Sequence, residues 1–230
     1  MHFSLVVVGA HDGSKSAATI DQAIARGRVL LIEPVPFLFA RLEAKYGGRP
    51  NVSLRKFAIS LSGGEQSFVA PLQTANSVQG YGDQLGSLIP DHAAKHDVRF
   101  TEHTEKIRVQ GLRFETLILS EDISSIDCLL TDTEGMDADL LLSFPFSRVL
   151  PQQIIFECKH ADGTLRIGKK LGGLLIALDC LGYDTRILDI ENMISVRRPL
   201  TCGHSSKKSR AVAAAVAYLL RVKVWANVWR

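Results

Sequence analysis

The chain has 230 residues, of which 46% are hydrophobic and 22% are charged, a composition typical of a globular protein. At this length we expect a single α/β domain with a large core. No apolar run reaches the roughly eighteen residues of a membrane span, and no secretory signal pattern opens the chain, so we expect a cytoplasmic protein.

Basic and acidic residues are distributed unevenly along the chain. The formal net charge is +3, but six basic residues and no acidic residue lie in 199–230. Residues 1–198 are therefore mildly acidic, and we expect no nucleic-acid partner. We expect one domain over 1–198 and a basic, helical extension over 199–230, in which Trp225 and Trp229 share a face. Through 207–230 this extension would lie on an anionic membrane surface. The alternatives are a helix packed on the domain or on a dimer partner, or a poorly ordered end.

The first predicted element is a buried strand. Val6, Val7 and Val8 form a continuous apolar run that ends in a Gly-x-x-x-Gly turn, and a helix is expected over 17–25. Such a strand-loop-helix unit suits a nucleotide-like cofactor, because glycine lets a ligand approach the main chain closely. The alternative is a tight turn without a ligand. The loop residues that we assign to cofactor binding are Gly9, Ala10, His11, Asp12 and Gly13.

This loop differs from two familiar nucleotide-binding loops. A dinucleotide fingerprint that starts at Gly9 would require glycine where His11 and Ser14 stand. A phosphate-binding loop needs a wider glycine spacing, with lysine directly after the second glycine. The sequence therefore argues against a nucleotide-dependent oxidoreductase.

The second predicted strand, 29–32, ends at an acid. In βαβ nucleotide folds, an acid about twenty residues after the glycine loop accepts hydrogen bonds from ribose hydroxyls. Glu33 stands at about that distance, so we predict that it binds ribose; the alternative is a solvated acid at a strand end. Pro34 stops the strand, and we expect a helix over 37–45 followed by a third strand over 52–59.

Later strands bring further acids to the same edge of the predicted sheet. The run 126–132 reads as a buried strand with Asp132 at its carboxyl end, and Glu134 follows shortly after. Glu157 ends the strand predicted after that. Because ligands of open α/β sheets bind outside the carboxyl ends of the strands, we expect these acids to share one crevice with the glycine loop.

Three motifs in this order resemble the FkbM-type methyltransferases. They are Val-x-Val-Gly-Ala-x-x-Gly at 6–13, Ile-Glu-Pro-x-Pro at 32–36 and Ile-Asp-x-Leu-x-x-Asp-x-Glu-Gly at 126–135, and the resemblance extends over roughly 3–198. It implies an S-adenosylmethionine-dependent enzyme with a Rossmann-like, doubly wound, seven-stranded and mostly parallel sheet of the class I methyltransferase type. The family usually has an acid where this chain has Val7.

The resemblance also gives expectations for the middle of the chain. It places the end of the third strand, at Phe57, Ala58 and Ile59, beside the adenine ring of the cofactor; the alternative is that these residues belong to the core. The stretch 60–99 has low periodicity, and in the family the corresponding segment covers the cofactor; the alternative is a surface insertion without a role. Its candidate substrate contacts are Tyr81, Gln84 and His92.

The remaining elements follow from local patterns. We expect short strands over 106–109 and 114–117 and a helix that begins with Ser120 as its cap. The elements predicted after the strand at 126–132 are helices over 137–144 and 165–181, a strand over 153–156, and a closing antiparallel pair over 186–188 and 193–196.

Methyl transfer requires an aligned acceptor and a group that removes the acceptor's proton. Asp132 is the first choice for this base, and Glu134 and Glu157 come next. Alternatively, Asp132 binds the cofactor's amino group, or the three acids together hold a magnesium ion. We do not favour the metal, because acids at adjacent strand ends are common without one. His11 and His160 are alternative bases, and we favour a structural hydrogen-bonding role for His160.

The sequence thus predicts a methyltransferase that modifies a hydroxyl of a small molecule, sugar or glycan, with the oxygen acceptor implied by the resemblance alone. The runner-up is a non-catalytic cofactor-binding or partner-binding domain of the same fold, which Val7 favours. The sequence leaves the identity of the acceptor and the oligomeric state open.

Overall fold

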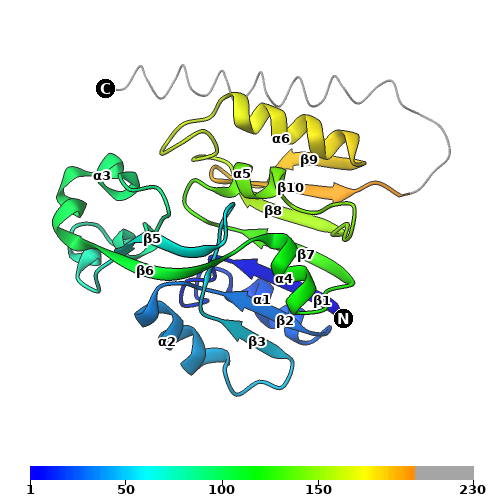
Figure 1. Cartoon of the computed structure of the whole chain (residues 1–230), viewed down its shortest axis with the longest axis horizontal. Helices are drawn as coiled ribbons and strands as arrows, with labels where there is room; N and C mark the ends of the chain where they lie inside the picture. The colour runs from blue at the N-terminus through cyan, green and yellow to red at the C-terminus, as the bar shows by residue number, and fades with distance from the viewer. Residues whose placement is uncertain (200–230) are drawn as a thin grey trace.

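The computed structural model describes residues 1–199, so the extension predicted over 199–230, including its suggested membrane contact, lies outside the described residues except for Pro199. The centre of the molecule is a seven-stranded sheet (Figure 1). Its strand order is β3 (Val52–Arg55), β2 (Val29–Ile32), β1 (His2–Val8), β7 (Ser125–Thr131), β8 (Gln153–Glu157), β10 (Asn192–Arg197) and β9 (Tyr183–Ile187).

Strand pairing in this sheet is parallel from β3 to β8, whereas β10 runs antiparallel to both β8 and β9. The predicted doubly wound, seven-stranded and mostly parallel sheet is therefore confirmed, and so is its closing antiparallel pair. The carboxyl ends of β1, β2 and β7 lie next to one another, which brings the loops after these strands to one edge.

Helices cover both faces of the sheet, because successive strand residues point to opposite sides. Leu5 and Val7 of β1 pack on the face covered by α1 and α2, and Val6 and Val8 pack on the face covered by α4, α5 and α6. Strands buried on both faces read as continuous apolar runs, which is why the sequence pattern revealed them. Within 1–199, none of the helices has the length and apolarity needed to cross a membrane. The helix bounds are α1 (Ala17–Ile24), α2 (Pro36–Tyr46), α4 (Phe114–Ser120), α5 (Asp137–Leu142) and α6 (Lys169–Cys180).

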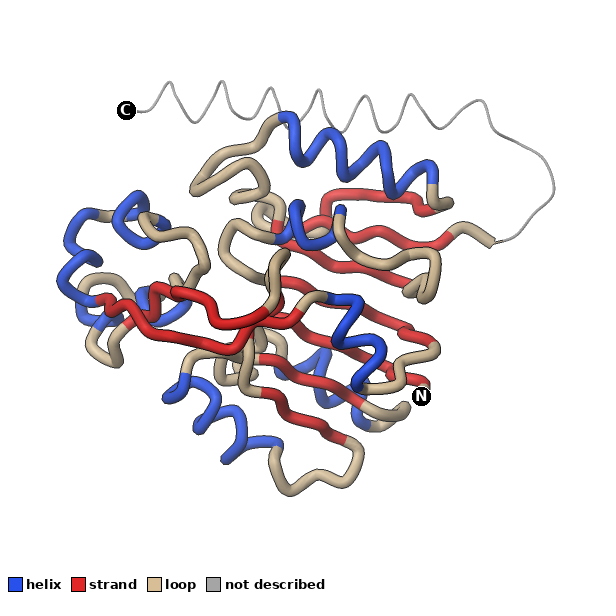
Figure 2. Tube along the Cα trace, viewed as in Figure 1, coloured by secondary structure: helices blue, strands red, loops and turns tan. Residues whose placement is uncertain are grey.

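A second, three-stranded sheet stands beside the main one. It has the order β4 (Ala58–Ile59), β6 (Thr104–Leu112) and β5 (Gly64–Pro71). Figure 2 shows β5 and β6 projecting sideways from the main sheet. The segment between them, 72–103, is called the insertion below. It contains η1 (Ala75–Ser77), η2 (Gly82–Gln84), α3 (His92–His96) and η3 (Val98–His103).

Several local predictions were wrong. The third strand predicted over 52–59 is two strands, since the chain leaves the main sheet after Arg55 and pairs with β6 from Ala58. No strand was expected in the stretch 60–99, which was predicted to have low periodicity, but it contains β5. The segment 114–117 is the start of helix α4 rather than a strand, and it buries Phe114, Leu117 and Ile118 at helical spacing.

Two helix starts were also misplaced. Ser120 does not cap a following helix: it is the last residue of α4, and its hydroxyl donates to the carbonyl oxygen of Leu117 at 3.2 Å. The helix predicted over 165–181 begins at Lys169, because Asp162 accepts the main-chain N–H groups of Gly168 and Lys170 at 2.7 Å each and so fixes the turn before it.

Candidate functional site

A cavity of about 440 Å³ lies at the carboxyl ends of β1, β2 and β7. This volume is in the range typical of small-molecule and cofactor sites. Its walls come from the glycine loop, the ends of β2 and β4, the turn after β7 and the insertion. Of the predicted site residues, those that line it are Gly9, Ala10, His11, Asp12, Glu33, Ala58, Asp132 and Glu134.

The two loop glycines serve the packing of the protein itself. Gly9 has φ +79°, and a Cβ there would lie 1.9 Å from the main-chain oxygen of Asp132. Gly13 has φ +75°, and its Cβ would lie 2.6 Å from the Tyr46 ring. These positions let the β1 loop approach the β7 turn and α2, and Gly9 also lines the cavity. Gly13 is not part of the cavity lining.

Glu33 is fixed at the tip of β2. Its side chain is buried, with Oε2 accepting the main-chain N–H of His11 at 2.9 Å and Oε1 accepting that of Val35 at 2.8 Å. Burial raises the pKa of Glu33 to about 7, although these two hydrogen bonds favour the ionised form. Each carboxylate oxygen can accept a further hydrogen bond, so Glu33 can bind a pair of hydroxyls in the cavity.

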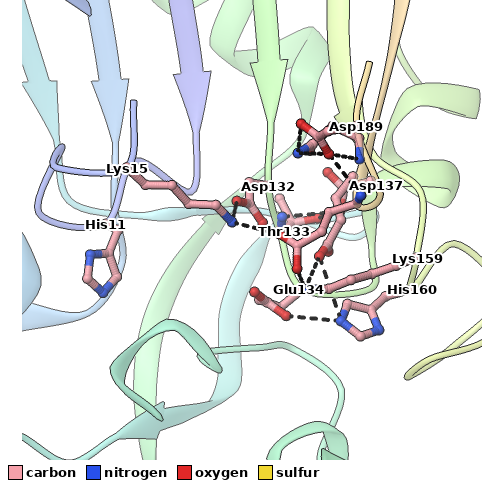
Figure 3. Close-up of polar contacts among 12 residues, drawn as sticks. His11, Lys15, Asp132, Thr133, Glu134, Asp137, Lys159, His160 and Asp189 are labelled. Carbon is pink, nitrogen blue, oxygen red and sulfur yellow. Dashed lines mark hydrogen bonds and ion pairs between the residues drawn. The ribbon is translucent and has the colours of Figure 1, made fainter. Parts of the chain in front are cut away.

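Sequence reasoning missed Lys15, which also lines the cavity. Its Nζ donates to Asp132 Oδ2 at 2.9 Å and lies 3.6 Å from Glu191 Oε2 (Figure 3). Burial alone would lower the pKa of Lys15, but the Asp132 carboxylate outweighs it, and the pKa lies above its usual value. The lysine was visible beside the glycine loop, but its partners are far away in the sequence.

Three carboxyl groups at this edge meet as predicted: Asp132, Glu134 and Glu157 offer oxygen atoms within 4.8 Å of one another. Burial, together with the charge of Asp132, raises the pKa of Glu134 to about 8. Burial and the neighbouring Glu134 raise the pKa of Glu157 well above its usual range. Glu157 does not line the cavity; its Oε1 lies 3.3 Å from Lys159 Nζ. The cations already placed beside these acids are thus the ammonium groups of Lys15 and Lys159.

The histidines join the insertion to the sheet edge. His11 Nε2 lies 3.2 Å from the main-chain oxygen of Asp83 in η2. His92 Nε2 lies 2.8 Å from Glu134 Oε2, and burial lowers the pKa of His92 to about 4. His160 accepts the main-chain N–H of Leu165 at Nδ1, at 2.7 Å, which fits the structural role that the sequence favoured for it.

The insertion forms one wall of the cavity. Ser87 Oγ donates to the main-chain oxygen of Glu134 at 2.8 Å, and a Cβ on Gly135 would lie 2.7 Å from Ile89 Cδ1. Gln84 alone of the three candidate substrate contacts lines the cavity: Tyr81 packs near Phe100 and His96, and His92 is buried against Glu134. The insertion residues in the lining are Asn76, Gly80, Asp83, Gln84, Gly86 and Leu88.

Comparison with known proteins decides the family. A model described as "Methyltransferase FkbM domain" matches residues 8–183, which is more than half of the chain. The chain belongs to the FkbM methyltransferase family. The family resemblance found in the three sequence motifs is thereby confirmed. No curated protein matches the chain.

Solved structures similar to this FkbM protein are distant. Methanococcus jannaschii fibrillarin, a pre-rRNA processing protein, has a TM-score of 0.45 and 13% identity over 85% of this chain and 66% of its own. Human methyltransferase-like protein 13 in complex with SAH has a TM-score of 0.44 and 11% identity over 96% of this chain and 83% of its own. Such likenesses are too weak to indicate a substrate.

The methyl donor of the FkbM family is S-adenosylmethionine, and the cavity fits it in composition. The buried carboxylate of Glu33 has lone pairs left for ribose hydroxyls. Phe57, Ala58 and Ile59 give an apolar wall suited to an adenine ring. Asp132 Oδ1 is a buried acceptor without a hydrogen-bond partner among the described residues, as expected where a bound group completes the site.

Proposed function

We propose that this FkbM protein transfers a methyl group from S-adenosylmethionine to a hydroxyl of a small molecule, sugar or glycan. One observation carries the proposal: a single cavity contains both the buried acid of β2, Glu33, and the carboxylate at the tip of β7, Asp132. The first is suited to holding an adenosyl group, and the second to receiving a proton from an acceptor.

S-adenosylmethionine supplies the electrophilic methyl group when it is bound. The protein holds the cofactor through Glu33 and aligns the acceptor, and alignment of this kind contributes up to roughly 7–11 kcal/mol to the lowering of a barrier. The insertion supplies one wall of the cavity through residues such as Gln84 and Leu88.

The proton of the acceptor hydroxyl passes to Asp132 in this proposal. Lys15 donates to Oδ2 of that carboxylate and so fixes its orientation at the cavity edge. A positioned base contributes about 10²–10⁴-fold in rate, less than alignment does. Glu134 lines the same wall and is the second candidate, whereas Glu157 lies behind it and would act only through its neighbours.

The experiment measures transfer of a labelled methyl group to a panel of hydroxyl compounds by the wild type and by Asp132→Asn. We expect turnover to fall by about 10²–10⁴-fold with unchanged cofactor affinity. Asp127→Asn is the matched control, because Asp127 lies on β7, the strand that leads to Asp132, but is exposed. Undiminished turnover by Asp132→Asn would eliminate Asp132 as the base.

The second candidate is a cofactor-binding domain without transferase activity. Its support is Val7, which is fully buried in the face covered by α1 and α2 and is not part of the cavity lining. The chain therefore has a buried apolar side chain where the family usually has an acid. If the protein binds S-adenosylmethionine but methylates no member of a broad acceptor panel, this second function replaces the first.

A further inference from the structure

Three histidines and a glutamate gather where the insertion meets the sheet edge. His92 and His96 come from α3, Glu134 from the turn after β7, and His160 from the loop after β8. Each offers one nitrogen or oxygen atom, and these atoms all lie within 4.8 Å of one another. The ring centroids of the histidines are 4.8–4.9 Å apart with edge-on orientations, so the rings surround a common point.

Spacing on the helix brings two of these rings together. His92 and His96 stand four residues apart in a His-x-x-x-His pattern, which places both on one face of α3. The same spacing supplies two of the zinc ligands in helical His-Glu-x-x-His motifs. His96 Nε2 is buried and has no hydrogen-bond partner among the described residues, although its ring is only partly buried.

Hydrogen bonds decide which nitrogen of each buried ring faces the cluster. His92 Nδ1 lies 2.9 Å from Thr164 Oγ1, so Nε2 is the atom directed at Glu134. His160 accepts the Leu165 N–H at Nδ1, so the neutral ring carries its own proton on Nε2. That N–H points toward Glu134 Oε2 at 3.5 Å, where Figure 3 shows the two side chains facing each other. Because Nε2 carries this proton, it has no lone pair for a metal ion, and it has no hydrogen-bond partner among the described residues. His160 is therefore a neighbour of the site rather than a metal ligand.

We propose that His92, His96 and Glu134 bind one transition-metal ion of the Zn²⁺ type, with Thr164 as a positioning residue. The ion replaces the proton now shared between His92 Nε2 and Glu134 Oε2, since only the deprotonated groups can coordinate it. Two histidines and a glutamate are an established zinc ligand set, in which a fourth position is left for water or another group. Zinc–nitrogen bonds of about 2.0–2.1 Å place tetrahedral ligand atoms about 3.4 Å apart, so the cluster needs to contract by roughly 1.4 Å at most.

The ligand chemistry separates this site from the acid cluster considered in the sequence. Imidazole ligands suit zinc, copper or nickel, whereas a set of carboxylates suits magnesium. Asp132 and Glu157 already have Lys15 and Lys159 beside them, while Glu134 faces the histidines. An ion here would join α3 of the insertion to the β7 turn and hold that wall of the cavity in place. The proposal does not depend on methyl transfer.

The test uses full-length, tag-free protein that has been treated with a chelator and then titrated with Zn²⁺ or Co²⁺. We expect one ion per chain, a visible absorption spectrum of low-symmetry, near-tetrahedral Co²⁺, and a rise in melting temperature that the chelator reverses. His96→Ala should weaken binding by at least about tenfold and abolish the rise in melting temperature. Since His96 does not line the cavity, S-adenosylmethionine binding remains a separate readout.

His103→Ala is the matched control, because His103 lies in the same insertion with similar partial exposure but outside the cluster. We expect it to bind the ion as the wild type does. Thr164→Val, which keeps all three ligands, should weaken binding by about 10–100-fold. Failure of the wild type to bind either ion would overturn the proposal, and so would equal binding by the wild type and His96→Ala.

Discussion

The two walls of the cavity are built in different ways. The sheet-edge wall consists of the loops after β1, β2 and β7, whose strands pair in continuous register. Its backbone has close contacts such as that between Gly9 and Asp132. The insertion has its own small core of Leu85, Ala93 and Phe100. It meets the sheet edge through hydrogen bonds such as that of Ser87 and through apolar contacts of Leu88 and Ile89. The first wall is suited to fixing a cofactor, and the second, whose own core is much smaller, to opening for an acceptor, because segments with few buried apolar contacts open at lower free energy.

The largest expected effect comes from comparing one glycine of each wall. Gly9→Ala places a Cβ 1.9 Å from the Asp132 oxygen at a positive φ, so the free energy of unfolding should fall by more than about 4 kcal/mol. In the insertion, Gly80 has no atom within 4 Å of the added Cβ, so Gly80→Ala should change it by no more than about 0.5 kcal/mol. Denaturant unfolding of both variants measures the two free energies of unfolding. Similar losses of stability in Gly9→Ala and Gly80→Ala would contradict the proposed difference between the two walls.

Cofactor binding should depend on the sheet-edge wall. Glu33→Ala removes a charged acceptor for ribose hydroxyls, and such hydrogen bonds contribute about 1.5–3 kcal/mol each. We expect the dissociation constant for S-adenosylmethionine to rise by roughly 100-fold in calorimetry. Glu43→Ala, an exposed acid on α2, is the control and should bind normally. Undiminished binding by Glu33→Ala would exclude Glu33 as the ribose ligand.

The same acid should make stability depend on pH. The pKa of Glu33 is raised from 4.5 to about 7 in the folded protein, so the folded state binds the proton more tightly than the unfolded state does. The stability of the wild type relative to Glu33→Gln should therefore be greatest below about pH 4.5. It should fall by about 3 kcal/mol as the pH rises through 7. The buried histidines titrate in both proteins, so their contribution cancels in the comparison. A difference in unfolding free energy between the two proteins that stays constant with pH would contradict the raised pKa of Glu33.

The smallest effect should be confined to the insertion. Ser87→Ala leaves the Glu134 carbonyl and the Ile89 N–H without their shared partner, a local cost of about 1–3 kcal/mol. We expect faster amide hydrogen exchange within 72–103 and unchanged exchange in β1 and β7. Ser77→Ala is the control, since that exposed hydroxyl bonds only within the insertion. Equal acceleration in β1 would show that the two walls open together.

The two walls also differed in how far the sequence could predict them. Buried parallel strands leave continuous apolar runs, so β1, β2 and β7 were found, together with Glu33 and Asp132 at their ends. The short helices of the insertion leave no such signal, and β5, the strand before it, was missed because its burial pattern is mixed.

Contacts between side chains far apart in the sequence could not be predicted either. Lys15 finds Asp132 at a separation of 117 residues, and His92 finds Glu134 at a separation of 42. Local spacing carries no information about either pair. Residues 114–117 were predicted as a strand although they begin helix α4. Their few apolar residues fit the periodicity of a strand as well as that of a helix.

The most direct measurement is a crystal structure of the full-length protein with S-adenosylhomocysteine. We expect the ribose hydroxyls within hydrogen-bonding distance of the Glu33 carboxylate, the adenine against Ala58, and the sulfur atom facing Asp132. A complex in which the product lies elsewhere, or in which side chains of the protein fill the space beside Glu33, would contradict this assignment of the cavity.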